Sequence, residues 1–266
     1  MLEPAQAILD ALVMPPGLER SFEVGVTVAR GATCEVGMIA RNCRPNLERN
    51  LEALERLSCH FARFAVRSYS NDCTDGTEAV LDSWRPMFPT TFDYEELGRP
   101  FLGGTRVAER TIALAEYRTT VQRMMEPAGI HLVLDPDMLL VDVRRLIAGL
   151  GDMVMGGYDV MAAQGLASMP RVIAGRMIHY DAFAWRPEWT WFQDDQRELS
   201  FHHDVRPAGC RPYRVNSAFG GACWYGGSYP RRVYDGSMGC EHVSFNRSVE
   251  GRVGISPNMS VVCFLQ

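Results

Sequence analysis

The segment Ile130-His131-Leu132-Val133-Leu134-Asp135-Pro136-Asp137 decides the fold class of this chain. Its first five residues form a short, mostly apolar run, which is typical of a strand buried on both faces of a sheet. The run ends in two carboxylates one residue apart, so their oxygens are expected at the carboxyl edge, where open α/β sheets bind ligands. Hard divalent cations favour such oxygens, and Mg²⁺ keeps positions open for phosphates. The alternative interpretation of Asp-x-Asp is a solvated turn after a strand.

Short apolar runs and helical stretches alternate on both sides of this segment, which predicts an α/β fold. Strands are expected at residues 36–40, 61–69, 92–93, 130–134, 153–163 and 217–225, and helices at residues 47–57, 77–84, 107–125 and 141–150. An edge strand is expected at residues 22–29, and a long loop or lid at residues 185–205. The second half of the chain has the less regular pattern.

Composition narrows the function classes. The chain has 266 residues, 47% hydrophobic and 22% charged, which predicts a single domain over residues 1–266. A net charge of −5 argues against a nucleic acid partner. No apolar run reaches the roughly 18 residues of a transmembrane segment, and the first 20 residues lack the positive start of a signal peptide. A cytoplasmic protein is therefore expected, and peripheral association with a membrane surface stays open.

The basic and sulfur-containing residues exclude several kinds of chemistry. All 27 basic residues are arginine, so Schiff-base catalysis and a P-loop lysine are excluded, and any basic phosphate contact must use arginine. The eight cysteines form no Cys-x-x-Cys pair, which argues against a zinc ribbon or a thioredoxin-type site. No Gly-x-Gly-x-x-Gly follows the first expected strand, which argues against a dinucleotide oxidoreductase.

A polar segment, Asn71-Asp72-Cys73-Thr74-Asp75-Gly76-Thr77, follows the second expected strand. Its small polar and acidic side chains can accept hydrogen bonds from a nucleobase or a ribose, which makes Asn71 and Asp72 candidate nucleotide contacts. The alternative is an Asx-rich turn that caps the next helix, with Asp75 or Thr77 as N-cap.

Five motifs in order carry a resemblance to a known family. Ser70–Thr77 (S-N-D-C-T-D-G-T) resembles the E-N-D-S-T-D-G-T stretch of GT-A nucleotide-sugar glycosyltransferases, with Ser70 in place of the usual Glu. It follows a strand that ends in Arg41-Asn42 and precedes an arginine-bearing helix and Asp-x-Asp. The segments Tyr180–Arg186, Val215–Gly221 and Cys240–Phe245 complete the set. The ensemble, over residues 36–245, is similar to the fungal capsule-type mannosyltransferases and their bacterial relatives.

The resemblance implies a GT-A fold, with a Rossmann-like, mostly parallel central sheet flanked by helices and an irregular acceptor side. Residues 35–150 would form the nucleotide-sugar-binding half, and residues 151–266 the acceptor and catalytic half. It implies a nucleoside-diphosphate sugar donor, UDP- or GDP-linked, a glycan or other hydroxyl acceptor, and Mn²⁺ or Mg²⁺ as cofactor. Asp137 is the expected direct metal ligand, with Asp135 on ribose or a metal-bound water. Neutral His242 is the expected third ligand.

The remaining candidate residues serve phosphate, sugar and catalysis. Arg110 and Arg41 are candidate phosphate or ribose contacts, against the alternative of solvated side chains. Gly220 and Gly221 could let the backbone approach the sugar, or could form a bulge. Glycosyl transfer with inversion needs a base, and the candidates are Glu241 and Asp181, with Asp194 and Asp195 as a third possibility. With retention, Glu241 would position the acceptor instead.

Two other functions stay open for this sequence. A nucleotidyltransferase can also pair an α/β nucleotide fold with an acidic metal site, but the residues after the first strand, A-R-N-C-R-P, lack its glycine-rich loop. A non-catalytic sugar- or nucleotide-binding module would keep the fold without turnover, and the intact carboxylates weigh against it.

Overall fold

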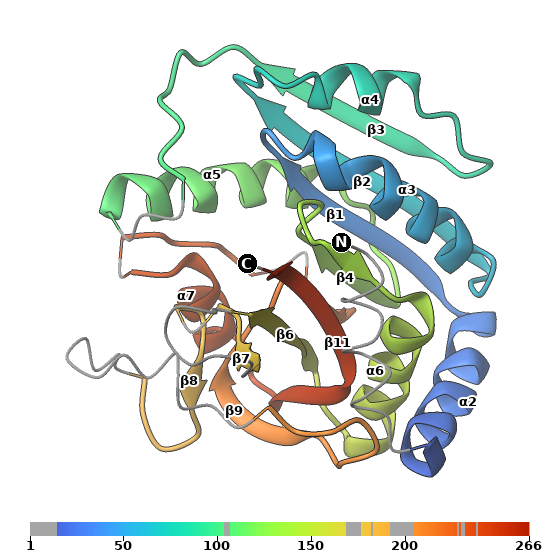
Figure 1. The fold of residues 1–266 in the computed structure, drawn as a ribbon. Coiled ribbons are helices and arrows are strands. Elements are labelled where there is room, and N and C mark those ends of the chain that lie inside the picture. The colour runs from blue at the N-terminus through green and yellow to red at the C-terminus, as the bar shows by residue number, and fades with distance from the viewer. Residues whose placement is uncertain are drawn as a thin grey trace.

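The computed structural model describes residues 15–103, 107–168, 177–181, 183–191, 205–227, 229, 232–237 and 239–265. These residues form one sheet of eleven strands with helices on both faces (Figure 1). The helices are α2 (Pro15–Gly31), α3 (Arg44–Ser58), α4 (Thr77–Ser83), α5 (Ala108–Met124), α6 (Val143–Gly156) and α7 (Glu241–Arg247). The strands are β1 (Thr33–Ala40), β2 (Arg63–Asn71), β3 (Thr90–Glu95), β4 (Ile130–Leu134), β5 (Leu140–Val141), β6 (Val160–Ser168), β7 (Met177–His179), β8 (Arg186–Pro187), β9 (Tyr213–Ser217), β10 (Ala222–Gly226) and β11 (Val253–Leu265).

The sheet is mostly parallel through its centre, as the sequence predicted. Its strand order is β3-β2-β1-β4-β10-β6-β11-β9-β8, with β5 paired to β11 and β7 to β6. Strands β3, β2, β1 and β4 are parallel, β10 is antiparallel to both of its neighbours, and β6 pairs in parallel with β11. The carboxyl ends of β1, β2 and β4 therefore lie at one edge of the sheet, where βα connections of such folds build ligand sites.

Alternation along the central strands explains why helices cover both faces. In β4, Leu132 and Leu134 belong to the core layer that holds the leucines of α3 and α6, whereas Val133 belongs to the layer that holds α5. In β10, fully buried Trp224 lies in the first layer and donates a hydrogen bond from Nε1 to the carbonyl of Leu146, at 2.8 Å. Since both faces of these strands are buried, their sequences read as continuous apolar runs.

The edge strand expected at residues 22–29 is wrong, because this segment lies inside helix α2. Its apolar residues fit both periods, and Pro15 and Pro16 open the helix, where a missing N–H costs nothing. Helix α2 lies against α6 (Figure 1), so closely that a Cβ atom on Gly25 would sit 1.9 Å from the carbonyl oxygen of Ile147. Packing of one helix backbone on another, rather than strand pairing, thus decides this segment.

Two other boundaries differ from the expectation. The strand expected at 153–163 begins only at Val160, because helix α6 runs on to Gly156 and ends at Gly157, whose φ is +61°. A left-handed glycine is the usual stop of a helix. The strand expected at 217–225 is two strands, β9 and β10, joined by a turn. Within the described ranges, no helix is long and apolar enough to span a bilayer.

Candidate functional site

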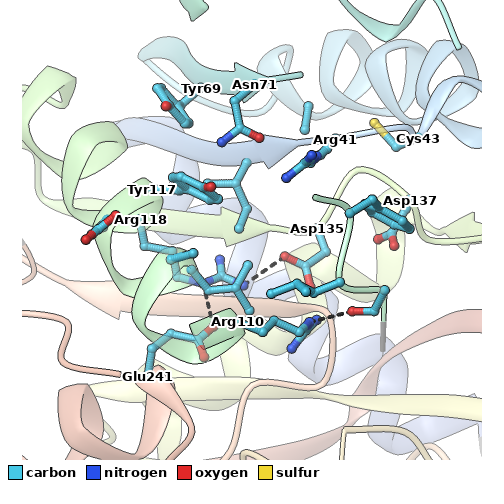
Figure 2. A pocket seen from close by; sticks show the side chains of 18 of the residues that line it. Arg41, Cys43, Tyr69, Asn71, Arg110, Tyr117, Arg118, Asp135, Asp137 and Glu241 are labelled. Carbon is cyan, nitrogen blue, oxygen red and sulfur yellow. Dashed lines mark hydrogen bonds and ion pairs between the residues drawn. The ribbon is translucent and has the colours of Figure 1, made fainter. Parts of the chain in front are cut away.

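A cavity of about 880 Å³ opens at the carboxyl edge of the parallel strands (Figure 2). This volume is at the upper end of the roughly 300–1,000 Å³ typical of ligand sites. The cavity gathers most of the residues that the sequence singled out. Those that line it are Arg41, Asn71, Arg110, Asp135, Asp137, Asp181, Glu241 and His242. Segments more than 200 residues apart in the chain therefore contribute to one site.

Helix α3 holds the Asp-Pro-Asp turn in place through two amides that the sequence did not indicate. Asn50 Nδ2 donates to the carbonyls of Pro136 and Met138, both at 2.8 Å, and Asn46 Nδ2 donates to the carbonyl of Asp137 at 2.7 Å. All three bonds go to backbone oxygens, so the carboxylates of the turn stay available to the cavity. The turn is consequently a preorganised element rather than a solvated loop.

Arg118, on helix α5, is the residue at the centre of the site that sequence reasoning left without a role. Its Nη2 donates to Asp135 Oδ1 at 3.1 Å and its Nε donates to Glu241 Oε1 at 3.0 Å (Figure 2). The side chains of Arg118 and Glu241 are only 5% and 4% exposed. The guanidinium carbon also lies 4.8 Å from the centre of the Phe219 ring. A charge-assisted bridge of this kind fixes two carboxylates at once.

Asp137 differs from Asp135 in its surroundings. The Asp137 side chain opens onto the cavity, where withdrawal from bulk water and the nearby charge of Asp135 raise its pKa to about 6. Burial also raises the pKa of Asp135, although Arg118 acts in the opposite direction. Two carboxylates that repel each other in this way form a local excess of negative charge. Such a pair is stabilised by any cation that enters the cavity.

His242 is buried and neutral. Its ring stacks on Phe219, with centroids 3.8 Å apart and an interplanar angle of 13°. Burial, followed by the charge of Arg118, lowers the pKa of this imidazole well below its usual value. Neither ring nitrogen has a hydrogen-bond partner among the residues that the structure describes, and Glu241 Oε1 lies 3.6 Å from Nε2. A neutral imidazole with free nitrogens has the chemistry of a metal ligand.

The acidic side chains of the cavity match the ligand preference of a divalent cation. Asp135 and Asp137 supply the oxygens that Mg²⁺ and Mn²⁺ prefer, and they line the same cavity as the unpartnered His242. Across the described part of the chain, however, no three His, Cys, Asp or Glu side chains are grouped closely enough to hold a metal ion. The two carboxylates therefore fit such a cation in their chemistry, and His242 as third ligand stays a prediction.

Asp181 is held in an unusual backbone conformation beside these groups. Its φ is +63°, and the other non-glycine residues with positive φ among those described, Asn42 and Asp72, also follow strands at this edge. Strained residues of this kind cluster at functional sites. Burial, with the charges of Glu241 and Asp135, raises the pKa of Asp181 to about 7. Its carboxylate can therefore exchange a proton near neutral pH.

The two candidate arginines both reach the cavity. Arg110 Nε donates to the carbonyl of Gly103 at 2.5 Å, a bond that Figure 2 shows as a dashed line. Arg41 Nη2 donates to the carbonyl of Arg99, also at 2.5 Å, and its buried Nε has no hydrogen-bond partner within the described ranges. Neither is a solvated side chain on a helix face. Each arginine is anchored to a loop carbonyl through one nitrogen, and its other nitrogens can donate hydrogen bonds to a ligand.

Three candidates lie outside the lining of the cavity. The carboxylate of Asp72 accepts hydrogen bonds from backbone N–H groups of residues 97–99. Gly220 and Gly221 form the β9–β10 turn with φ of +67° and +87°. A Cβ at Gly220 would lie 2.1 Å from the carbonyl oxygen of Ala163, so close packing alone accounts for this glycine. Gly221 acts on the site indirectly, because its carbonyl accepts the Asp135 N–H at 2.9 Å.

The segment after β2 forms the Asx turn that the sequence gave as an alternative, and a nucleotide contact by this segment stays a prediction. Asn71 lines the cavity at the end of the strand. Asp75 Oδ1 accepts from the N–H and the hydroxyl of Thr77, at 2.9 and 2.7 Å, which is the Asx turn ahead of α4. The N-cap position itself is Gly76, with φ of +85°. The alternative base candidates Asp194 and Asp195 lie outside the described residues.

Comparison with known proteins identifies the fold. No protein-family model and no curated protein sequence matches this chain. The solved structures that it resembles include residues 1–349 of TarS from S. aureus, at a TM-score of 0.51 and 12% identity, over 86% of this chain and 59% of TarS. The mannosyltransferase PcManGT from Pyrobaculum calidifontis, in complex with GDP-Man and Mn²⁺, gives a TM-score of 0.54 and 14% identity, over 96% of this chain and 67% of that one.

A further TarS structure holds UDP-GlcNAc and matches at a TM-score of 0.50 and 12% identity, over 88% of this chain and 58% of that one. The chain thus spans about three fifths of the length of TarS residues 1–349. At these identities the likeness shows the fold alone, and the fold is the GT-A type that the sequence predicted, with a mostly parallel central sheet flanked by helices.

Proposed function

We propose that this chain is a metal-dependent glycosyltransferase that moves a sugar from a nucleoside-diphosphate sugar, UDP- or GDP-linked, to a hydroxyl of a glycan or another acceptor. One observation carries the proposal: a GT-A sheet brings acidic and arginine side chains from β4, α5, α7 and the connections after β1 and β7 into one cavity. The complexes of TarS with UDP-GlcNAc and of PcManGT with GDP-Man and Mn²⁺ support this class of donor.

The two halves of the chain would bind different substrates. Residues 35–150 would bind the donor, because β1, β2, β4 and α5 place polar and charged side chains in the cavity. Residues 151–266 would bind the acceptor and include Asp181 and Glu241. Membership of the capsule-type mannosyltransferase group and a cytoplasmic site of action stay predictions of the sequence.

Asp135 and Asp137 would hold Mn²⁺ or Mg²⁺, with His242 as the proposed third ligand. When bound, the cation would neutralise the diphosphate that leaves as the sugar is transferred. The rise in the pKa of Asp137 to about 6 supports this role, because burial and the neighbouring charge of Asp135 cause it, and a bound cation would offset both. Arg118 favours the charged form of both carboxylates, but its ion pair within this turn is with Asp135, at 3.1 Å.

Arginine side chains would bind the rest of the donor. Arg110 and Arg41 each reserve one nitrogen for a loop carbonyl and can direct the others to phosphate or ribose oxygens. The Nη1 of Arg118 is buried and has no hydrogen-bond partner in the described part of the chain, so it can donate to a ligand in the cavity. Asn71, at the end of β2, would form hydrogen bonds with the nucleoside.

Asp181 is the better candidate for accepting a proton from the acceptor hydroxyl. Its pKa of about 7 lets it act as a base near neutral pH, whereas Glu241 is committed to Arg118 at 3.0 Å. If configuration is inverted, Asp181 takes the proton. If it is retained, Glu241 and Arg118 position the acceptor.

A thermal-shift screen of UDP-, GDP- and dTDP-sugars, each with and without Mn²⁺, tests the proposal. A nucleotide bound at 100 times its Kd stabilises the native state by about 2.7 kcal/mol. We expect one nucleotide class to raise Tm only when Mn²⁺ is present, and Asp137→Ala to remove that rise. Asp93→Asn, on an exposed part of β3, is the control. No response to any nucleotide contradicts the proposal, and binding without sugar transfer favours a non-catalytic module.

A further inference from the structure

Asp72 occupies a position from which sequence reasoning expected a nucleotide contact, yet its side chain serves the protein itself. We propose that Asp72 is a positioning residue that fastens residues 97–103 as one wall of the cavity, and that it acts on the donor only through this wall. The inference rests on the proposed function, because it assigns the wall to the donor nucleotide.

Three consecutive backbone N–H groups converge on the Asp72 carboxylate. Oδ1 accepts from Leu97 and Gly98, both at 2.8 Å, and Oδ2 accepts from Arg99 at 3.2 Å. Gly98 has a φ of +63°, which helps to turn successive N–H groups toward one anion. Both oxygens of the side chain are thereby committed to the turn.

Arg41 fastens the same turn from the other side. Its Nη2 donates to the carbonyl of Arg99 at 2.5 Å and lies 3.7 Å from Asp72 Oδ2. Its guanidinium carbon lies 5.6 Å from the centre of the Phe101 ring. Asp72 and Arg41 follow neighbouring parallel strands, β2 and β1, so the sheet edge itself sets where the turn is held.

The fastened segment needs such an anchor. It leaves β3, which is the terminal strand of the sheet order, so within the described chain no further strand supports it. Residues 99–103 line the cavity, although Phe101 is 61% exposed and so contributes little burial of its own. Polar fastening by Asp72 and Arg41, and the bond from Arg110 to Gly103, therefore keep this wall in place.

The backbone at position 72 explains why a short carboxylate serves there. The φ of Asp72 is +47°, a left-handed conformation that Asp, Asn and Gly tolerate. Partial burial acts to raise the pKa of Asp72, but the hydrogen bonds from Gly98, Arg99 and Leu97 lower it overall, so the side chain stays charged. At this φ, Asn can keep some of the hydrogen bonds to residues 97–99. Gly can adopt the same backbone conformation but makes none of these hydrogen bonds.

Two variants and a control test the inference. Asp72→Gly removes the carboxylate, Asp72→Asn keeps one acceptor oxygen, and Asp93→Asn removes a charge from the exposed surface of β3. Hydrogen exchange of residues 97–99 is measured by mass spectrometry, and the Kd of UDP and of GDP, with Mn²⁺, by calorimetry. For Asp72→Gly we expect exchange roughly tenfold faster and nucleotide binding several-fold weaker. Asp72→Asn should be intermediate on both measures, and Asp93→Asn should match the wild type.

Two results would overturn the inference. Weaker nucleotide binding by Asp72→Asn with unchanged exchange at 97–99 would mean that Asp72 contacts the donor directly. Faster exchange with unchanged affinity would mean that the wall does not serve the donor. If the wild-type protein binds neither UDP nor GDP, the proposed function fails, and the exchange measurement still decides whether Asp72 fastens the turn.

Discussion

Arg118 Nε lies 3.0 Å from Glu241 Oε1, although 123 residues separate the two in the chain. The same guanidinium binds Asp135, so helix α5 joins the end of β4 to the start of α7. Both partners of the Arg118–Glu241 pair are almost fully buried. The pair is therefore part of the cavity wall, and loss of either partner would leave the other charge buried and unpaired.

Removal of the Arg118 charge should destabilise the protein strongly. Arg118→Met leaves Glu241 buried and unpaired, which costs about 3–5 kcal/mol of unfolding free energy. Arg118→Lys keeps the charge but lacks the two separate nitrogens with which arginine reaches Asp135 and Glu241, so a smaller loss is expected. Urea unfolding measures both, with Arg123→Met, at an exposed position of α5, as control. A loss no larger than the control's would show that the pair contributes nothing.

Glu241→Gln should reduce turnover more than donor affinity. Glutamine keeps the shape and one acceptor for Arg118 but removes the negative charge that we propose positions the acceptor. Because misplaced reactants slow transfer, we expect kcat to fall by roughly 10²-fold, with the Kd of the donor changed only slightly. Steady-state kinetics with calorimetry separates the two quantities. Equal losses in both would assign Glu241 to donor binding.

Asp181 should impose a pH dependence on stability and activity. Because its folded pKa, about 7, lies above the ordinary value of 3.8, the native state holds the extra proton between these values. The contribution of Asp181 to stability is therefore fully present at low pH and is lost as pH rises from about 4 to 7. Asp181→Asn should raise Tm relative to wild type at pH 8 but not at pH 4, by a few degrees.

Activity gives an independent reading of the same residue. If Asp181 is the base, kcat/KM of the wild type rises with an apparent pKa near 7, and Asp181→Asn has little activity at any pH. Activity of Asp181→Asn with an unchanged pH profile would exclude this role.

Asp152 offers a test that separates fold from site. It is 2% exposed and does not line the cavity. Its carboxylate accepts hydrogen bonds from Ser21, Ser256 and Asn258, at 2.6, 2.6 and 2.9 Å, which ties α2 and β11 to α6. Asp152→Ala should cost about 3 kcal/mol, with roughly 1 kcal/mol for each lost bond. Turnover per folded molecule should stay unchanged, as measured below Tm. A selective loss of kcat would contradict this view.

Sequence reasoning succeeded where local pattern decides structure. The apolar run before Asp135 predicted β4, because a short run of five mostly apolar residues is typical of a strand that is buried on both faces. The same reasoning failed at α2, where Phe22 and Val26 satisfy a strand period and a helix period alike. It gave no strand for β11, in which Ser256, Asn258 and a register shift interrupt the apolar pattern.

The sequence singled out most of the charged residues that line the cavity, but it gave no role to Arg118 and did not indicate how these residues bond. Asp135 and Asp137 follow a strand, so their place at the sheet edge follows from topology. The bridge from Arg118 to Glu241 depends on a tertiary contact that no local spacing encodes. The direction of the Asp72 side chain, toward the turn at 97–99, likewise depends on the path of a loop.

The most direct test of the account is Mn²⁺-dependent cleavage of UDP- and GDP-sugars by the wild-type protein and by Asp137→Ala. Asp137 opens onto the cavity, and its charge is disfavoured there by burial and by Asp135, so the variant should fold with a Tm no lower than that of the wild type. We expect that the wild type cleaves the donor only when Mn²⁺ is present and that Asp137→Ala does not cleave it. Equal cleavage by a folded Asp137→Ala, or wild-type cleavage that chelation of the metal leaves unchanged, would contradict it.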